Sequence, residues 1–419
     1  MRLTRLTYLP ALLLVLSLLS VKVRPQQTEP QKQQPGAMGV STGSPHPAVK
    51  DALSRPITAG GFVDGAPVVF ADITKQAGLD KFHHRSGNPE KATVLETPGS
   101  GVALLDYDND GWLDIYLLNG STFAALQGKE PAPRAMLFHN NHDGTFTDAT
   151  DKAGVSNERW GFGVAVGDYD NDGWPDLYVA NYGKNRLYHN NHDGTFVDDT
   201  FRSGIGNKAV LLSGVAMKFL DYDNDGWPDI LQLNGAMLDN INLYHGEVSY
   251  KEPLLMFRNL GKGQFEKASE SLGPDFMRPI AGRGLATADY DNDGDIDIVT
   301  NNRGDYPSLL RNDGGNTNHW LEVLLIGTRS NRDGVGASLK LTAEGATHVE
   351  QAKGGMSYMS SNDPRIQFGL GKRTKIDSLE ITWPSGQVDR LTNIPVDQII
   401  AVKEGAGIVP RKFPRVPSK

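Results

Sequence analysis

One nonapeptide recurs four times in this chain, and it constrains the fold more than any other feature. Every copy begins with Asp-Tyr-Asp-Asn-Asp-Gly and ends in Asp. The copies start 62, 53 and 68 residues apart, which is the spacing of a structural repeat with insertions. They occupy Asp106–Asp114, Asp168–Asp176, Asp221–Asp229 and Asp289–Asp297.

Short apolar segments flank each copy, as Gly101–Leu105 does before the first. A second pair of strands is predicted after most copies. It is clearest in Arg186–Thr200, where Asp193 and the following glycine form a tight-turn signal. Leu137–Thr150 repeats this hairpin closely, and Met256–Ser269 repeats it more loosely. Each unit is therefore predicted to contain four antiparallel strands.

Four-stranded units at this spacing are typical of a β-propeller, in which radial repetition protects most sheet edges. The high content of 47 Gly and 24 Pro also favours short strands and turns over long helices. Val68–Leu79 resembles Thr145–Val155, which is the end of a repeat unit. Nothing like the first three strands of a unit precedes Val68 in the sequence. We therefore expect this segment to be a lone outer strand that completes the final blade.

The four nonapeptides predict metal sites. Carboxylates stand at positions 1, 3, 5 and 9, and they repel one another unless a cation lies among them. Oxygen ligands in a flexible loop with a glycine at position 6 favour calcium, and position 7 is expected to contribute its backbone carbonyl. The flanking strands argue against an EF-hand, and solvated acidic turns are the alternative. The predicted ligands are Asp106, Asp108, Asp110, Trp112, Asp114, Asp168, Asp170, Asp172, Trp174, Asp176, Asp221, Asp223, Asp225, Trp227, Asp229, Asp289, Asp291, Asp293, Asp295 and Asp297.

These loops resemble the FG-GAP (or VCBS) repeats of integrin α-chain propellers. Trp320–Ala337, Gly354–Gly371 and Leu379–Gly386 resemble the ASPIC/UnbV domain, which follows such repeats in the cartilage acidic protein family. The resemblance covers roughly residues 65–408 and implies calcium in the four loops. The chain has no cysteine and no room for a C-terminal EGF-like module, so it is more similar to bacterial members than to animal ones.

The end of the chain also predicts a compact β-domain by its own alternating pattern. Its expected strands are Leu321–Leu325, Ser338–Thr342, Ile366–Leu370, Leu379–Trp383 and Ile399–Val402. The predicted fold is therefore all-β, a propeller of FG-GAP-like four-stranded repeats followed by a small C-terminal β-domain. The predicted organisation is a signal peptide or anchor (1–25), a Gln/Pro/Gly-rich disordered linker (26–64), the propeller (65–317), the ASPIC/UnbV-like domain (318–408) and a tail (409–419).

The N-terminus predicts export. Arg2 and Arg5 precede Leu9–Val21, an apolar run of 13 residues, which is the layout of a secretory signal. This run is short for a transmembrane span. Because no clean cleavage site follows it, an uncleaved membrane anchor stays the alternative. The expected location is secreted, periplasmic or on the cell surface.

Composition excludes several classes of function. The net charge of −8 argues against a nucleic-acid binder, and the lack of cysteine rules out disulfides, thiolate metal sites and a cysteine nucleophile. No Walker loop, dinucleotide fingerprint or G-x-S-x-G elbow is present.

A few other residues are candidates. Arg303–Asp305 is an Arg-Gly-Asp tripeptide, either an adhesion motif or a simple turn. His83 and His84, with Arg85 and Glu96, suggest acid–base chemistry or a metal site, but a structural role is the more ordinary interpretation. Four histidines occupy equivalent hairpin positions, which favours a shared turn: His139, His142, His189 and His192.

The sequence thus predicts an exported, calcium-binding propeller that acts as a non-catalytic binding, scaffold or adhesion module. An extracellular protein or glycan is the expected ligand, and membrane contact is expected only through an uncleaved N-terminal anchor. The alternative is a carbohydrate-active hydrolase or lyase that uses the propeller channel, because fold alone does not exclude catalysis. A pocket with convergent acids away from the loops would favour the enzyme, and a polar or aromatic face would favour binding.

Overall fold

The computed structural model describes residues 71–414, apart from residues 92, 207, 210, 211, 244, 245 and 356. The predicted signal segment, the predicted linker and the end of the predicted tail lie outside these residues. The chain divides into two compact units, residues 1–41 and residues 42–419, and all described residues belong to the second. None of the helices in the described part of the chain has the length and apolar character needed to span a bilayer.

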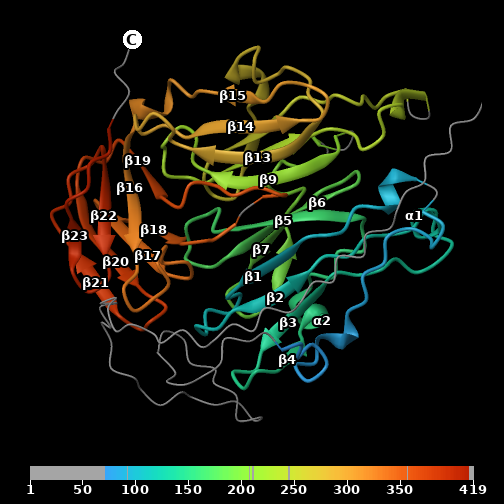
Figure 1. Cartoon of the computed structure of the whole chain (residues 1–419), viewed down its shortest axis with the longest axis horizontal. Helices are drawn as coiled ribbons and strands as arrows, with labels where there is room; N and C mark the ends of the chain where they lie inside the picture. The colour runs from blue at the N-terminus through green and yellow to red at the C-terminus, as the bar shows by residue number, and fades with distance from the viewer. Residues whose placement is uncertain are drawn as a thin grey trace, which may run out of the picture. The chain divides into compact units, whose positions relative to one another are not determined.

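The repeats form four consecutive antiparallel sheets (Figure 1). Three sheets have four strands each in chain order, and the fourth has three. Two short helices, α1 (Phe123–Leu126) and α2 (Thr150–Ala153), lie in the connections of the first repeat. The strands are β1 (Val102–Leu105), β2 (Asp114–Leu117), β3 (Met136–Asn140), β4 (Phe146–Asp148), β5 (Gly161–Gly167), β6 (Asp176–Asn181), β7 (Arg186–Asn190), β8 (Phe196–Asp198), β9 (Gly214–Leu220), β10 (Asp229–Asn234), β11 (Leu255–Asn259), β12 (Phe265–Lys267), β13 (Gly282–Ala288), β14 (Asp297–Asn302) and β15 (Ser308–Leu310).

The first strand of each sheet contacts the first strand of the next, in the order β1, β5, β9 and β13. Apolar side chains fill the space between neighbouring sheets, because successive strand residues point to opposite faces. Leu105 and Val179 share one buried cluster, and Tyr178 and Phe257 share the next. The all-β prediction is confirmed, and radially repeated four-stranded sheets are compatible with the propeller prediction.

The expected strand in Val68–Leu79 begins outside the described residues. The described part, residues 71–78, forms the turn that follows such a strand, and a turn of 3-10 helix follows at Leu79–Lys81. The backbone amide of Phe146 donates to the Ala77 carbonyl, so the segment packs on the hairpin of the first sheet. Gly154 lies against Phe196 in the same way, because the turn that ends one repeat contacts the hairpin of the next. Within the described residues the fourth sheet has no fourth strand.

The C-terminal domain consists of two four-stranded sheets packed face to face. One has the order β19-β16-β22-β23, with β16 and β22 parallel, and the other has the order β18-β17-β20-β21. Leu321, Leu341, Leu379 and Trp383 belong to the core between them. All five predicted strands are present, and the sequence missed β18, β21 and β23. The strands are β16 (His319–Ile326), β17 (Ser338–Ala343), β18 (Ala346–Gln351), β19 (Ile366–Gly371), β20 (Ile376–Thr382), β21 (Val388–Leu391), β22 (Gln398–Lys403) and β23 (Gly407–Val409).

Candidate metal centre

Each nonapeptide joins the first and second strands of one sheet, and we number these connections loop 1 to loop 4. The backbone reverses sharply because two positions adopt the left-handed conformation. Position 6 is glycine in every loop, with φ between 89° and 102°. Position 4 is asparagine in every loop, with φ between 54° and 60°, which asparagine tolerates better than most residues.

Hydrogen bonds within each loop hold the carboxylates in place, and loop 1 shows the pattern. The carboxylate of Asp106 accepts the amides of Asp110 at 3.0 Å and Gly111 at 2.8 Å. Oδ1 of Asp110 accepts the amide of Trp112 at 2.8 Å. The same bonds recur in the other loops, with lengths of 2.7–3.1 Å. The carboxylates at positions 1 and 5 are thus oriented by the backbone.

Position 9 ties the loop to the third strand of its sheet. Oδ2 of Asp114 accepts the amide of Tyr107, and Oδ1 accepts the amide of Asn140 at 2.8 Å. The corresponding asparagine of each later repeat also donates its side-chain amide to the tyrosine carbonyl of the preceding loop, as Asn190 does to Tyr107 at 2.8 Å. Every loop is therefore fixed by its own sheet, and loops 1 to 3 are also fixed by the next repeat.

The position 3 carboxylate of each loop has one oxygen whose surroundings indicate a bound cation. In all four loops its Oδ1 is buried, and within the described residues it has no hydrogen-bond partner: Asp108, Asp170, Asp223 and Asp291. A buried carboxylate oxygen without a partner is costly unless a cation lies beside it. The carboxylates of positions 1, 3 and 5 lie close enough together to hold one ion in loops 1 to 3. The donor set thus fits a divalent cation with oxygen ligands.

Negative charge is concentrated in the acidic loops, as loop 2 shows. Burial, together with the nearby carboxylates of Asp176 and Asp172, raises the pKa of Asp168 to about 8, although the Gly173 hydrogen bond lowers it. Burial likewise raises the pKa of Asp176 to about 7, despite hydrogen bonds from His189 and Asn190. The loops therefore hold more negative charge than their surroundings stabilise, which is the condition that a bound cation corrects.

Basic side chains from the neighbouring hairpin hold the outer oxygens. Nε2 of His142 lies 2.6 Å from Oδ2 of Asp110, and Nδ1 of His139 lies 3.3 Å from Oδ2 of Asp108. His192 and His189 repeat these contacts in loop 2. In loop 3 one arginine replaces both histidines: Arg258 contacts Asp223 at 2.9 Å and Asp225 at 3.2 Å. The sequence predicted only a shared turn for the four histidines. His142 and His192 do adopt the left-handed turn conformation. The imidazole rings of all four histidines also contact aspartates of the acidic loops.

A series of asparagine side-chain hydrogen bonds, which we call the asparagine ladder, links the four loops. The sequence pattern alone did not predict these bonds. The side-chain amide at position 4 donates to the position 6 carbonyl of the next loop: Asn109 to Gly173 at 3.1 Å, Asn171 to Gly226 at 2.7 Å and Asn224 to Gly294 at 3.0 Å. The signal that was present is the asparagine at position 4 of every copy.

We expect Asn171→Gly to destabilise the repeat region by about 1 kcal/mol, because glycine keeps the left-handed backbone and removes the amide bond to loop 3. Asn393→Gly is the matched control, because Asn393 has φ 57° and is exposed. Urea unfolding of both variants measures the difference. Equal stability of the two variants would show that the ladder contributes nothing.

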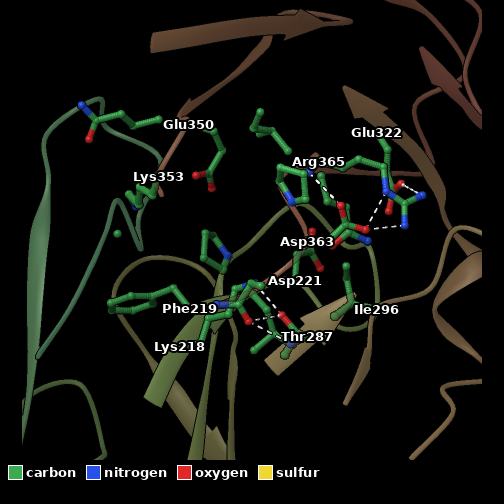
Figure 2. A pocket seen from close by; sticks show the side chains of 18 of the residues that line it. Lys218, Phe219, Asp221, Thr287, Ile296, Glu322, Glu350, Lys353, Asp363 and Arg365 are labelled. Atoms are coloured by element: carbon green, nitrogen blue, oxygen red, sulfur yellow. Dashed lines mark hydrogen bonds and ion pairs between the residues drawn. The ribbon is translucent and has the colours of Figure 1, made fainter. Parts of the chain in front are cut away.

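A cavity of about 110 Å³ lies between β9, β13 and the C-terminal domain (Figure 2). Several of its polar side chains are paired within each domain. Arg365 contacts Glu322 at 2.7 Å and donates to Asp363 at 2.7 Å, and Lys218 donates to the Thr287 hydroxyl. Removal from bulk water lowers the pKa of Lys218 to about 8. Arg365 thus binds two of the carboxylates, and Glu350 and Asp221 line the same cavity.

A second cavity, of about 420 Å³, lies at the ends of β5 and β9 away from the acidic loops. Apolar and aromatic side chains line it, including Leu95, Phe123, Phe162, Tyr182 and Ile241. Among the described residues around it there is no Asp, Glu, His, Lys or Arg. Such a surface suits the binding of an apolar group.

The remaining sequence candidates have structural partners. Asp305 of the Arg-Gly-Asp tripeptide contacts Lys251 at 2.9 Å and Arg278 at 3.5 Å, which supports the turn interpretation. Glu96 is buried and accepts the amides of Asn88 and Thr93, both at 2.8 Å.

The histidine pair near Glu96 does not form a catalytic cluster with it. His84 lies 3.1 Å from the Ser100 hydroxyl, and Arg85 donates to Glu130 at 3.0 Å. His84, Arg85 and Glu96 do line one cavity of about 410 Å³, but their separate partners favour the structural interpretation.

Comparison with known proteins supports the repeat assignment. The family described as "FG-GAP-like repeat" matches residues 106–179, 168–232 and 246–300, and the family described as "ASPIC and UnbV" matches residues 327–409. Among solved structures, an Agrocybe aegerita lectin that recognises terminal N-acetylglucosamine aligns with a TM-score of 0.28 and 18% identity, over 59% of this chain and 64% of the lectin. A likeness of that degree carries no argument.

Curated relatives align over most of the chain. Cartilage acidic protein 1 of Homo sapiens is 28% identical over 76% of this chain, and that of Xenopus tropicalis is 27% identical over 77%. The aligned regions are 43% and 45% of those proteins, so the chain spans less than half the length of the curated relatives that it matches. The chain is therefore a protein of FG-GAP-like repeats with a C-terminal ASPIC and UnbV domain, as the resemblance in its sequence indicated, and it is similar to cartilage acidic protein 1.

Proposed function

We propose that this chain is an exported calcium-binding repeat protein that serves as a non-catalytic binding or scaffold module outside the cytoplasm. The buried, unpartnered position 3 oxygen of all four loops carries the proposal. The carboxylates at positions 1, 3, 5 and 9 of each loop would hold the ion, and calcium prefers such oxygen ligands in a flexible loop. Bound there, calcium supplies positive charge that stabilises the loops.

The arrangement of the two cavities favours binding over catalysis. The cavity beside the C-terminal domain has Glu322 and Asp363 bound by Arg365, and the apolar cavity has aromatic lining. A hydrolase or lyase needs carboxylates that are free to exchange protons with substrate. An extracellular protein or glycan that offers an apolar group is the proposed ligand.

A calcium titration by calorimetry tests the first part of the proposal. We expect four equivalents for the full chain. Asp170→Asn should remove one equivalent, because it neutralises the position 3 ligand of loop 2. Asp193→Asn is the matched control: Asp193 accepts the amide of Thr195 in a nearby turn, and its loss removes the same charge without touching a loop. Equal losses in both variants would indicate non-specific attraction and contradict the proposal.

The ligand is sought separately. An array of extracellular proteins and glycans, screened with calcium and with chelator, would identify it. Binding that requires calcium and is lost in Phe162→Ala, which alters the apolar cavity, would place the ligand there.

A further inference from the structure

Loop 4 differs from the other three loops in its charge. Position 7 is Asp295, where the other loops have tryptophan, so five carboxylates lie within nine residues. Asp295 is completely buried, and neither of its oxygens has a hydrogen bond of ordinary geometry within the described residues, although the Gly315 backbone lies against Oδ1. A buried carboxylate in this state is stabilised by a bound cation or is neutralised by a proton.

The residues that follow the third strand of the fourth sheet do not supply that positive charge. Arg311 stands where Arg258 stands in loop 3, but it pairs with Asp313 at 2.6 Å instead of reaching the loop. In loop 3, by contrast, Arg258 binds the outer oxygens at positions 3 and 5. Loop 4 therefore combines the largest negative charge with no arginine from its own hairpin.

The C-terminal domain encloses loop 4. The ring of Trp320 lies so close to Gly294 that an added Cβ would clash with it. Arg365 donates to the Asp289 carbonyl at 2.5 Å and to the Asn292 side chain at 2.8 Å. Asn292 donates in turn to the Pro414 carbonyl at 2.5 Å. Segments before, within and after the C-terminal domain thus surround loop 4. The same domain also packs on loop 3, where the Gly371 amide donates to the Asn224 carbonyl at 2.8 Å and Gly369 lies against Asp221.

Loops 1 and 2 are more open. Asp110 and Asp172, at position 5, are exposed, and the imidazoles that contact them, those of His142 and His192, are each 44% exposed. In loop 4, by contrast, Asp291 and Asp295 are buried, and Asp293 at position 5 is half-buried.

We propose that loop 4 holds a divalent cation enclosed between the repeats and the C-terminal domain, and that this cation ties the domain to the repeats. The inference rests on the proposed calcium binding and goes beyond it. By linkage, docking of the domain strengthens cation binding in loop 4, and the cation strengthens docking to the same degree. Loops 1 and 2 take no part in this coupling.

Release kinetics test the enclosure. The calcium-loaded full chain is mixed with excess fluorescent chelator, and the amplitude and rate of each release phase are measured. We expect the equivalent of loop 4, identified by its weakening in Asp295→Asn, to leave at least tenfold more slowly than those of loops 1 and 2. Trp320→Ala should remove this difference in rate and leave the equilibrium stoichiometry at four. Asp295→Asn should weaken the slow site at least tenfold, whereas Trp174→Phe should leave loop 2 nearly unchanged.

A control separates enclosure from general destabilisation. Leu339→Ala creates a cavity in the core of the C-terminal domain. Because Leu339 belongs to that core and not to the contact with loop 4, the variant should lower the melting temperature without accelerating slow release. Limited proteolysis gives a second readout. The connection at residues 311–318 should be resistant in calcium and cleaved in chelator, and Asp295→Asn should be cleaved in both.

The two proposals fail in different ways. If no calcium is bound at all, the proposed function is refuted together with this inference. If four equivalents leave at a single rate, or if Trp320→Ala leaves the slow phase unchanged, calcium binding stands and the enclosure is refuted.

Discussion

Removal of calcium is expected to destabilise the repeat region by on the order of 11 kcal/mol. A site with a dissociation constant of about 10 µM, in about 1 mM calcium, adds roughly 2.7 kcal/mol to the free energy of unfolding. Four such sites reach a value comparable with the whole stability of a typical domain, ~5–15 kcal/mol. The ions also bring positive charge to a chain with a net charge of −8.

Calorimetric melting in calcium and in excess chelator measures this effect. We expect the melting temperature to fall by on the order of 20 °C. The double variant Asp168→Asn with Asp172→Asn should remove only about a quarter of the shift, because it disables one loop in four. An unchanged melting curve, with metal analysis confirming a calcium-free protein, would show that the loops are not sites that matter for folding.

The second large effect concerns Glu404 in the C-terminal domain. Its buried side chain accepts the amides of Thr328 and Arg329, both at 2.7 Å, and of Ser330 at 2.8 Å, together with the hydroxyl of Ser385. Burial alone would raise its pKa, but the Ser385 hydroxyl and these amides outweigh burial and lower the pKa to about 2. The carboxylate thus fixes the connection between β16 and β17.

The direction of the pH dependence follows from this shift. The folded-state pKa lies below the usual value of 4.5, so the stabilisation is fully present above about pH 4.5 and is lost as the pH falls towards 2. A shift of this size corresponds to about 3 kcal/mol. Glu404→Gln should therefore destabilise the C-terminal domain by about 2–3 kcal/mol at pH 7, and its difference from the parent should shrink at pH 3.

Urea unfolding at the two pH values provides the measurement. Glu380→Gln is the control, because Glu380 pairs with Arg390 at 2.6 Å on the exposed side of β20 and such pairs contribute less than about 1 kcal/mol. The interpretation of Glu404 would be wrong if the two variants lost the same stability, or if the Glu404→Gln difference did not depend on pH.

The parts that could be predicted from the sequence are those that depend on local chemistry. Each acidic loop is held by hydrogen bonds within nine residues, as Asp106 shows with Gly111, so its residue pattern alone indicates its shape. The ladder could not be assigned, because Asn171 donates to Gly226, which lies in another repeat. The histidine contacts were missed for the same reason: Asp172 and His192 meet only when the hairpin folds beside the loop.

One omission in the fold has a physical cause as well. The sequence missed β18 (Ala346–Gln351) because it lacks a clear apolar alternation and pairs through its backbone with β17. Backbone pairing of this kind leaves little trace in side-chain type.

The ladder has a consequence for how such chains change length over evolution. Each repeat presents an asparagine amide to the next and a glycine carbonyl to the one before, so a duplicated repeat would find matching partners on both sides. The amide of Asn292, in the last loop, is instead received by the Pro414 carbonyl and flanked by Arg365. Terminal units of repeat proteins need such a cap. We therefore expect gain or loss of repeats to be tolerated upstream of loop 3, because the C-terminal domain contacts both loop 3 and loop 4.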